Sequence, residues 1–256
     1  LRAFGGQILK PFQSKQRGER EHEFYERVFK DGAMHNTPTY QQLRPLLPGY
    51  RGLVVVAEET AEGGLHPGKY LALEDLTWGR AWPCIVDVKV GTRSYEDGAS
   101  DEKIAYERSK FPLQTRVGFR VQGIKVYDPT AQVYVEHDKH VGRGITTESD
   151  LAQLFATFFP MGNAVQAQRL LQAFITRLAQ FQQWFETQDE FEFIASSLLF
   201  LYDGQHEGDG RADIRLIDFA HVQYTTPETR RRDEGVLLGV TTLQAIFQQL
   251  LAQMAK

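Results

Sequence analysis

Cysteine is almost absent from this chain of 256 residues, because Cys84 is the single one. An internal disulfide needs two cysteines, so the sequence excludes one, and such sparse use is typical of a reducing compartment. We therefore expect a cytoplasmic or nuclear location. No run of apolar residues approaches the roughly 18 that cross a membrane, so stable membrane insertion is not expected.

A strong excess of charge of one sign is also lacking. The formal net charge of −4 argues against a general nucleic-acid binder. Residues 89–125, however, contain eight basic and five acidic side chains. A basic island in an acidic protein suits a compact polyanionic ligand. The alternative is a helix and hairpin of mixed charge that face water, and the charges alone leave both open.

Three well-known nucleotide-binding and kinase motifs are missing as well. The sequence contains no G-x-x-x-x-G-K-[ST] loop, no G-x-G-x-x-G and no H-R-D catalytic loop. P-loop proteins and ordinary protein kinases are therefore poor fits. Any handling of nucleotide phosphates would have to use other residues.

The segment Pro83–Gly91 has the alternation of a β-strand with one apolar face. Asp87 and Lys89 are two residues apart, so their side chains would share the opposite face. An acceptor and a cation side by side on a rigid strand can bind a ligand that carries both hydroxyls and phosphates. A surface salt bridge on a half-buried strand is the alternative for this segment taken alone.

A second apolar segment, Arg215–His221, includes Asp218 at the end of a predicted strand, a natural place for a metal ligand. Together the two segments resemble the inositol polyphosphate kinase family. Its signatures P-x-x-x-D-x-K-x-G, S-S-L-L and I-D-F occur here in that order, at Pro83–Gly91, Ser196–Leu199 and Ile217–Phe219. The resemblance covers essentially the whole chain.

The resemblance implies an α+β, two-lobed kinase-like fold, in which antiparallel sheets pack with helices and ATP lies in the cleft between the lobes. We expect an N-terminal lobe of antiparallel strands and one helix at residues 1–77, and a C-terminal lobe at 78–256. The second lobe would carry a short helix that binds inositol phosphates at about 101–111. Apolar residues at spacings of three and four predict a core helix over 163–186, and a strand is expected over 191–201.

The same resemblance implies ATP and Mg²⁺ as cofactors. Lys10 matches the lysine that braces the ATP phosphates, and Glu21 is its candidate partner. Asp87 would bind the ribose hydroxyls, and Asp218 would hold Mg²⁺, because hard cations prefer carboxylate oxygen. The backbone between the lobes would pair with adenine. The residues so implied for the nucleotide are Lys10, Glu74 through its carbonyl, Leu76 through its amide, Asp87 and Asp218.

For an inositol polyphosphate substrate, the resemblance implies a set of mostly basic side chains. Lys89 would meet the transferring phosphoryl group, and Lys89 and Asp218 are the expected catalytic residues. A core or capping role is the alternative for His221. The expected helix departs from the multikinase branch of the family at Tyr106 and Glu107, where that branch has amide side chains. The substrate set comprises Lys89, Arg93, Lys103, Lys110, Arg17 and His221.

The predicted function is ATP-dependent phosphorylation of hydroxyls on soluble inositol polyphosphates. The run Arg93–Leu113 is most similar to the multikinase branch, which acts on tris- and tetrakisphosphates. Few residues separate the predicted strand Pro83–Gly91 from the next predicted hairpin, which disfavours the trisphosphate 3-kinase branch. The alternatives are a hexakisphosphate kinase that makes pyrophosphates and a non-catalytic scaffold. We expect a monomer that binds no nucleic acid, and contact with a phosphoinositide headgroup is left open.

Overall fold

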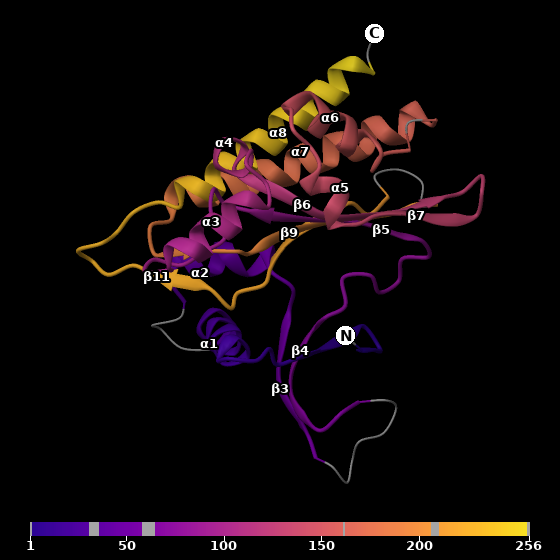
Figure 1. Cartoon of the computed structure of the whole chain (residues 1–256). Helices are drawn as coiled ribbons and strands as arrows, with labels where there is room; N and C mark the ends of the chain where they lie inside the picture. Colours follow the sequence, from indigo (N-terminus) through magenta and orange to yellow (C-terminus); the bar gives the residue numbers. More distant parts are fainter. Residues whose placement is uncertain (1, 31–35, 58–64, 161, 206–209, 255–256) are drawn as a thin grey trace.

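The computed structural model describes residues 2–30, 36–57, 65–160, 162–205 and 210–254 (Figure 1). These residues form helices and three sheets in which every strand pair is antiparallel. The predicted α+β class is therefore confirmed.

The first sheet is built from the N-terminal part of the chain. It has four strands in the order β1-β2-β4-β3. Helix α1 (Arg17–Phe29) covers it and buries Phe24, Tyr25 and Val28. The strands are β1 (Arg2–Phe4), β2 (Gln7–Pro11), β3 (Tyr50–Val56) and β4 (Gly68–Glu74), with helices α2 (Pro38–Leu43) and η2 (Arg44–Leu46) between β2 and β4 in sequence.

The second sheet has five strands in the order β10-β9-β5-β6-β7. Its central strand is β5 (Pro83–Val90), in which buried residues alternate with half-buried ones. Asp87 and Lys89 lie on the half-buried face, as the alternation predicted. The other strands are β6 (Phe119–Asp128), β7 (Val133–His137), β9 (Ser197–Asp203) and β10 (Asp213–Ile217).

The single strand predicted over 191–201 is wrong. The segment forms two strands, β8 (Phe191–Phe193) and β9, and β8 pairs with β11 (Val222–Tyr224) in a separate sheet. The break has a local cause, because Ala195 has a φ of 58°. A left-handed residue cannot continue a β ladder. The break also frees the carbonyl of Ala195 from strand pairing.

Within the part of the chain that the structure describes, six helices follow β5. Helix α7 (Ala164–Thr187) confirms the predicted core helix, with Leu171, Phe174 and Phe181 fully buried. Helix α3 begins after the N-cap Ser100 and ends at Ser109, slightly before the predicted end, and none of its residues is buried. The six are α3 (Asp101–Ser109), α4 (Gln114–Val117), α5 (Lys139–Arg143), α6 (Glu148–Ala156), α7 and α8 (Glu234–Gln253).

Helix α8 is long and apolar enough to cross a membrane by length and composition alone. This was not expected from the sequence. In the fold, α8 packs against α7 and buries Val240, Leu243 and Phe247 in the core. Membrane insertion would expose that core, so the packing of a core helix explains the apolar composition.

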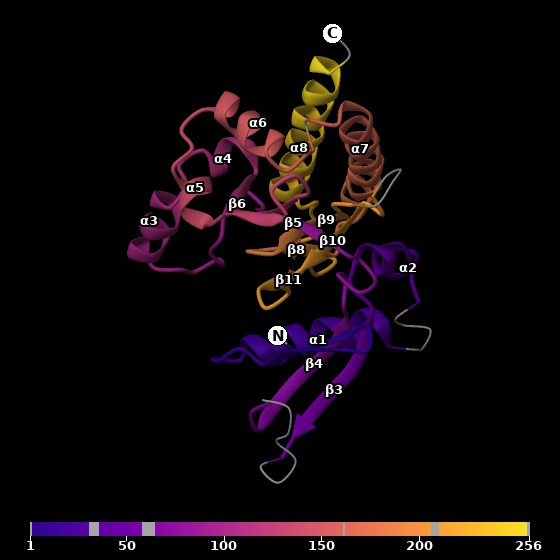
Figure 2. The ribbon, with the colours of Figure 1, turned by 90° about the vertical axis from the view of Figure 1, so that its right-hand side faces the viewer.

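The layers place the two large sheets next to each other. In Figures 1 and 2 the N-terminal sheet with α1 lies at one end of the molecule, α7 and α8 lie at the other, and the five-stranded sheet runs between them. The chain passes from the first sheet to the second between β4 and β5. The predicted division of the lobes at residues 77 and 78 falls in this connection and stays a prediction.

Candidate active site

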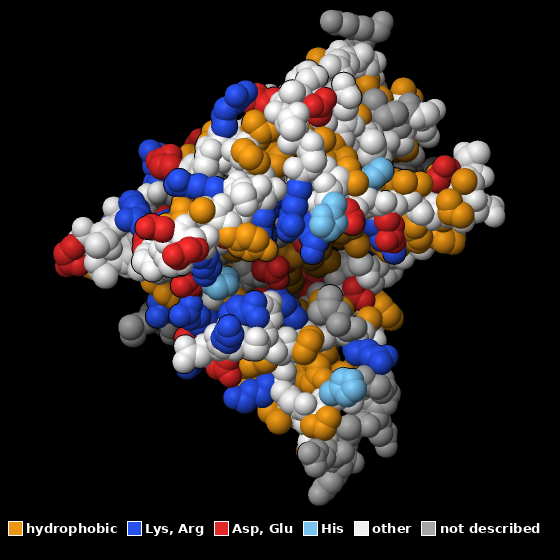
Figure 3. All heavy atoms as spheres, in the orientation of Figure 1, with side chains coloured by type: hydrophobic (Ala, Val, Ile, Leu, Met, Phe, Trp, Pro, Cys, Tyr) orange, Lys and Arg blue, Asp and Glu red, His pale blue; other side chains and the backbone are white. Residues whose placement is uncertain are grey.

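A cavity of about 530 Å³ lies between the N-terminal sheet and the strands β5, β9 and β10. The space-filling view shows a hollow at this level of the molecule, with Lys and Arg side chains around it (Figure 3). Charged residues at one part of the wall and apolar residues at another suit a ligand with a flat ring and an anionic tail. The apolar wall includes Ile8, Tyr25, Leu73, Ile85, Leu199 and Ile217.

Lys10 is the centre of the charged wall. Its Nζ lies 2.8 Å from Oε1 of Glu21 and 2.6 Å from Oδ1 of Asp218. Burial lowers the pKa of Lys10, but the two carboxylates outweigh it, so the pKa is raised overall. Lys10 therefore stays charged, and the predicted pairing of Lys10 with Glu21 is confirmed.

The backbone of Asp218 is held in an unusual conformation. Its φ is 67°, which an aspartate tolerates better than most residues. Two contacts fix the turn, since the Ser196 hydroxyl donates to the Asp218 carbonyl at 2.8 Å and the Phe219 amide donates to Glu21 at 3.2 Å. Strained residues held in this way gather at functional sites.

Asp87 contributes an acceptor that lacks a donor. Its Oδ1 atom is buried, and no described residue forms a hydrogen bond to it. Burial raises the pKa of Asp87, and the Ser197 hydroxyl opposes this effect. A buried acceptor without a partner in a cavity wall suits a ligand that brings hydroxyl donors. This is the chemistry predicted for Asp87.

Lys89 lies beside this group but does not line the same cavity. Its Nζ donates to the carbonyl of Ala195 at 2.7 Å. Burial lowers the pKa of Lys89, although Asp218 and Asp87 are near enough to oppose the shift. The ammonium group would have to exchange the Ala195 carbonyl for a phosphate oxygen in order to act on a ligand.

Glu74 and Leu76, predicted at the adenine end, both line the cavity. The Glu74 carboxylate accepts hydrogen bonds from the Gly49 amide at 2.9 Å and from Arg215 at 3.2 Å. The Leu76 carbonyl accepts one from Arg80. These contacts hold the connection between the two sheets in place, which is what a backbone that binds a ring must provide.

Arg17 and His221, predicted to bind substrate, do not line the cavity. Arg17 donates to the carbonyl of Ser14 at 3.1 Å. Nδ1 of His221 lies 2.7 Å from Oε1 of Glu96, which also accepts from Arg20 at 2.8 Å. Both side chains therefore have partners within the protein, and their predicted roles stay predictions.

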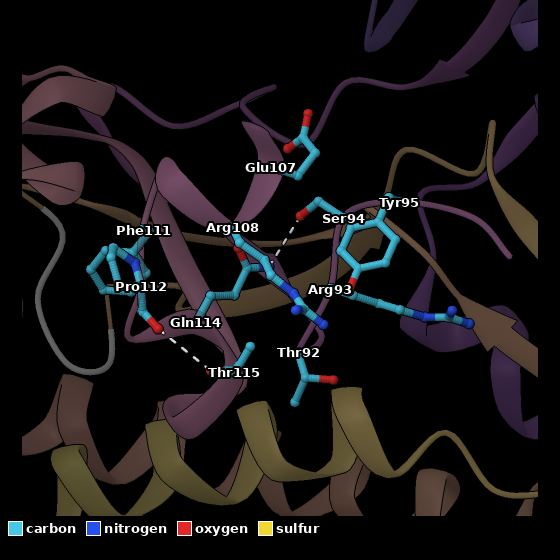
Figure 4. A pocket seen from close by; sticks show the side chains of 10 residues that line it. All are labelled: Thr92, Arg93, Ser94, Tyr95, Glu107, Arg108, Phe111, Pro112, Gln114 and Thr115. Carbon is cyan, nitrogen blue, oxygen red and sulfur yellow. Dashed lines mark hydrogen bonds between the residues drawn. The ribbon is translucent and has the colours of Figure 1, made fainter. Parts of the chain in front are cut away.

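Arg93 is also occupied by acidic partners. It pairs with Asp97 and lies 3.0 Å from Glu192. It lines a second hollow of about 390 Å³ beside α3, and its guanidinium points away from that of Arg108 (Figure 4). The structure does not bring Arg93 to the larger cavity.

The two lysines of the predicted substrate helix differ in environment. Lys103 is exposed, and no ion pair of its side chain is found among the described residues. Lys110, at the C-cap of α3, pairs with Glu107 and lies 4.2 Å from the ring centre of Tyr106. Neither lysine lines the larger cavity, so their part in substrate binding also stays a prediction.

Sequence reasoning missed two residues of this region. The Ala195 carbonyl binds Lys89 through a backbone atom, and no side-chain pattern signals such a contact. Tyr25 lines the cavity, although nothing in the sequence distinguishes it from a core residue of an apolar helical face. A cavity wall and a core face have the same sequence pattern.

Asp218 is the predicted metal ligand, and the donor set fits a hard dication. Within the described residues, no group of three or more His, Cys, Asp or Glu could hold a metal by itself. The side chain of Asp218 is 39% exposed. A single accessible carboxylate suits Mg²⁺, which keeps several waters and binds through one or two carboxylates together with substrate phosphates.

Comparison with known proteins gives consistent matches. A family model described as inositol polyphosphate kinase matches residues 70–248. Inositol polyphosphate multikinase from Mus musculus is 39% identical over 202 residues, which cover 79% of this chain and 48% of that protein. Inositol hexakisphosphate kinase 3 from Mus musculus is 30% identical over 205 residues, 71% of this chain and 51% of that protein. The chain spans about half the length of these curated relatives.

A solved structure is similar over its full length. Inositol phosphate multikinase Ipk2 from S. cerevisiae, in complex with ADP and Mn²⁺, has a TM-score of 0.74 and 28% identity. The match covers 96% of this chain and 100% of that chain. The fold expected from the sequence is thereby confirmed.

Proposed function

Since the chain belongs to the inositol polyphosphate kinase family, we propose that it transfers the γ-phosphoryl group of ATP to a hydroxyl of a soluble inositol polyphosphate. One observation carries the proposal. Lys10 is clamped between Glu21 and Asp218 in the wall of a cavity where Asp87 also presents an unpaired acceptor. A fixed cation suits the phosphates of a nucleotide, a carboxylate suits its metal, and a free acceptor suits its ribose hydroxyls.

Different residues of the cavity would bind different parts of the nucleotide. The adenine ring fits the apolar wall next to Glu74 and Leu76, whose backbone would pair with it. The ribose hydroxyls donate to Asp87. Lys10 braces the phosphates as a point charge. The Ipk2 structure holds ADP and Mn²⁺, and we propose ATP and Mg²⁺ for this chain.

Phosphoryl transfer depends mainly on alignment and on charge stabilisation. Asp218 would hold a divalent cation, which supplies charge neutralisation between the phosphates. Lys89 leaves the Ala195 carbonyl and donates to the oxygen of the migrating phosphoryl group, where negative charge develops. The neighbouring phosphates of the inositol aim the attacking hydroxyl. No separate aspartate base is required by this arrangement.

The substrate is proposed to be an inositol trisphosphate or tetrakisphosphate. The similarity of 39% to a multikinase, against 30% to a hexakisphosphate kinase, favours the lower phosphates. A monomeric state, a cytoplasmic or nuclear location and the absence of nucleic-acid binding or stable membrane insertion stay predictions, and contact with a phosphoinositide headgroup stays open.

A direct assay tests this function. The protein is incubated with ATP, Mg²⁺ and either inositol trisphosphate or inositol hexakisphosphate, and the products are resolved by anion-exchange chromatography. We expect the trisphosphate to gain phosphates while the hexakisphosphate stays unchanged. Conversion of the hexakisphosphate alone would support the hexakisphosphate kinase instead. Binding of the trisphosphate without any turnover would support a scaffold and contradict the proposal.

A further inference from the structure

A group of buried hydrogen-bond donors on and next to β6 lacks acceptors. Among the described residues, Nε and Nη1 of Arg120, Nε2 of Gln122 and Nε of Arg143 are buried and have no hydrogen-bond partner. The Arg120 side chain is only 3% exposed. Buried donors of this kind are nearly always satisfied in folded proteins. Three neighbouring side chains with unpaired donors therefore point to an anion that the protein binds.

Arg120 lies next to the residues of the proposed transfer reaction. It is the direct cross-strand partner of Lys89, so both side chains leave the sheet on the same face. Burial lowers the pKa of Arg120, and the nearby Arg143 of α5 adds to this effect. The same face of β5 carries Asp87. The unpaired donors are thus continuous with the site where a phosphoryl acceptor would lie.

One carboxylate lies over this group. Glu107 of α3 pairs with Lys110, and its Oε2 lies 4.0 Å from Nη2 of Arg120, too far for a hydrogen bond. The Glu107 side chain is 15% exposed. In Figure 4 its carboxylate points away from Arg108, its neighbour on the same helix. The Glu107 carboxylate thus lies near three cations, namely Lys89, Lys110 and Arg120.

The helix that carries Glu107 is weakly attached. None of the nine residues of α3 is buried. Segments with few buried contacts move at low cost. The Glu107 carboxylate can therefore be displaced from Arg120 without disturbing the core.

We propose that Arg120 is an additional phosphate-binding residue for the inositol polyphosphate, and that Glu107 occupies its place in the free protein. The inference rests on the proposed function, because it assigns one phosphate of that substrate. Glu107 then tunes affinity. A phosphate must displace this carboxylate, so substrates that place a phosphate here bind more weakly than the cations alone would allow.

The test measures binding of inositol trisphosphate by isothermal titration calorimetry, without turnover. We expect Glu107→Gln to lower the Kd about tenfold. The substitution removes a partly buried negative charge that repels the incoming phosphate. Glu102→Gln, on the exposed side of the same helix, is the matched control and should leave the Kd unchanged. The affinity for ADP should be unchanged in both variants.

A second variant separates Arg120 from Lys110, which Glu107→Gln also releases. Arg120→Met should raise the Kd of inositol trisphosphate about tenfold or more. When Glu107→Gln is added to Arg120→Met, the Kd should stay almost the same as in Arg120→Met alone. If Glu107→Gln still lowers the Kd about tenfold in the Arg120→Met protein, the effect belongs to Lys110 and the proposal is overturned. If Arg120→Met does not fold, Glu107→Gln decides alone, and a Kd equal to that of Glu102→Gln overturns the inference. Failure of the wild type to bind inositol trisphosphate would overturn the proposed function as well.

Discussion

Replacing Asp218 by Asn is expected to lower kcat by at least ~100-fold, the range typical of losing a preorganised charge contact. The reason is that Asp218 combines two functions, as the ligand of a divalent cation and as the partner of Lys10 at 2.6 Å. The fold should be kept, because asparagine tolerates the left-handed backbone of this position and the Ser196 hydroxyl binds a backbone atom. The measurement is the steady-state rate with saturating ATP, Mg²⁺ and inositol trisphosphate.

The matched control for this variant is Asp189→Asn. Asp189 is an exposed carboxylate that pairs with Arg230 away from the cavity. It should keep the wild-type rate. A folded Asp218→Asn protein whose kcat stays close to that of Asp189→Asn would show that Asp218 has no part in the transfer.

Replacing Lys89 by Ala is also expected to lower kcat by at least ~100-fold. Lys89 donates to the Ala195 carbonyl and does not line the nucleotide cavity. We therefore expect the affinity for ADP to be unchanged, since the loss concerns charge that develops during transfer. The measurements are kcat in the same assay and the Kd of ADP by calorimetry.

Lys69→Ala serves as the control for Lys89→Ala, because Lys69 is an exposed lysine on β4 that lies over the ring of Phe12. It should change neither quantity. If Lys89→Ala weakens ADP binding as much as it slows turnover, Lys89 binds the nucleotide and its assignment to the migrating group is wrong.

The parts of the site that follow from local patterns could be predicted from the sequence. The alternation in β5 places Asp87 and Lys89 on one face, and the structure confirms this. The pairing of Lys10 with Glu21 is implied by the family resemblance, and it forms at 2.8 Å. The prediction for β5 succeeds because the period of a strand fixes the direction of each side chain.

Contacts that depend on backbone detail or on distant segments could not be predicted. The left-handed backbone of Ala195 splits the expected strand, and an alanine does not predict such a backbone conformation. Arg93 and His221, which are predicted to bind substrate, pair with acidic residues of the protein, and their role in binding stays a prediction. For His221 that residue is Glu96, 125 positions away. Sequence spacing carries no information about which of several acids a long basic side chain meets.

The environment of α8 could not be predicted from its apolar composition either. The sequence contains no continuous run of apolar residues long enough for a membrane, yet α8 as a whole is long and apolar enough to cross one. Its packing against α7 and the burial of Phe247 show a place in the core. Composition alone does not distinguish a helix buried in protein from one buried in lipid.

The central claim is that one cavity holds a nucleotide with its metal at Asp218 and its phosphates next to Lys10. A crystal structure of the protein with ADP and Mn²⁺, with the manganese located by anomalous scattering, tests it most directly. We expect the manganese within about 2.2 Å of an Asp218 oxygen, the phosphates against Lys10 and the ribose against Asp87. A nucleotide outside this cavity, or manganese that does not contact Asp218, would contradict the account.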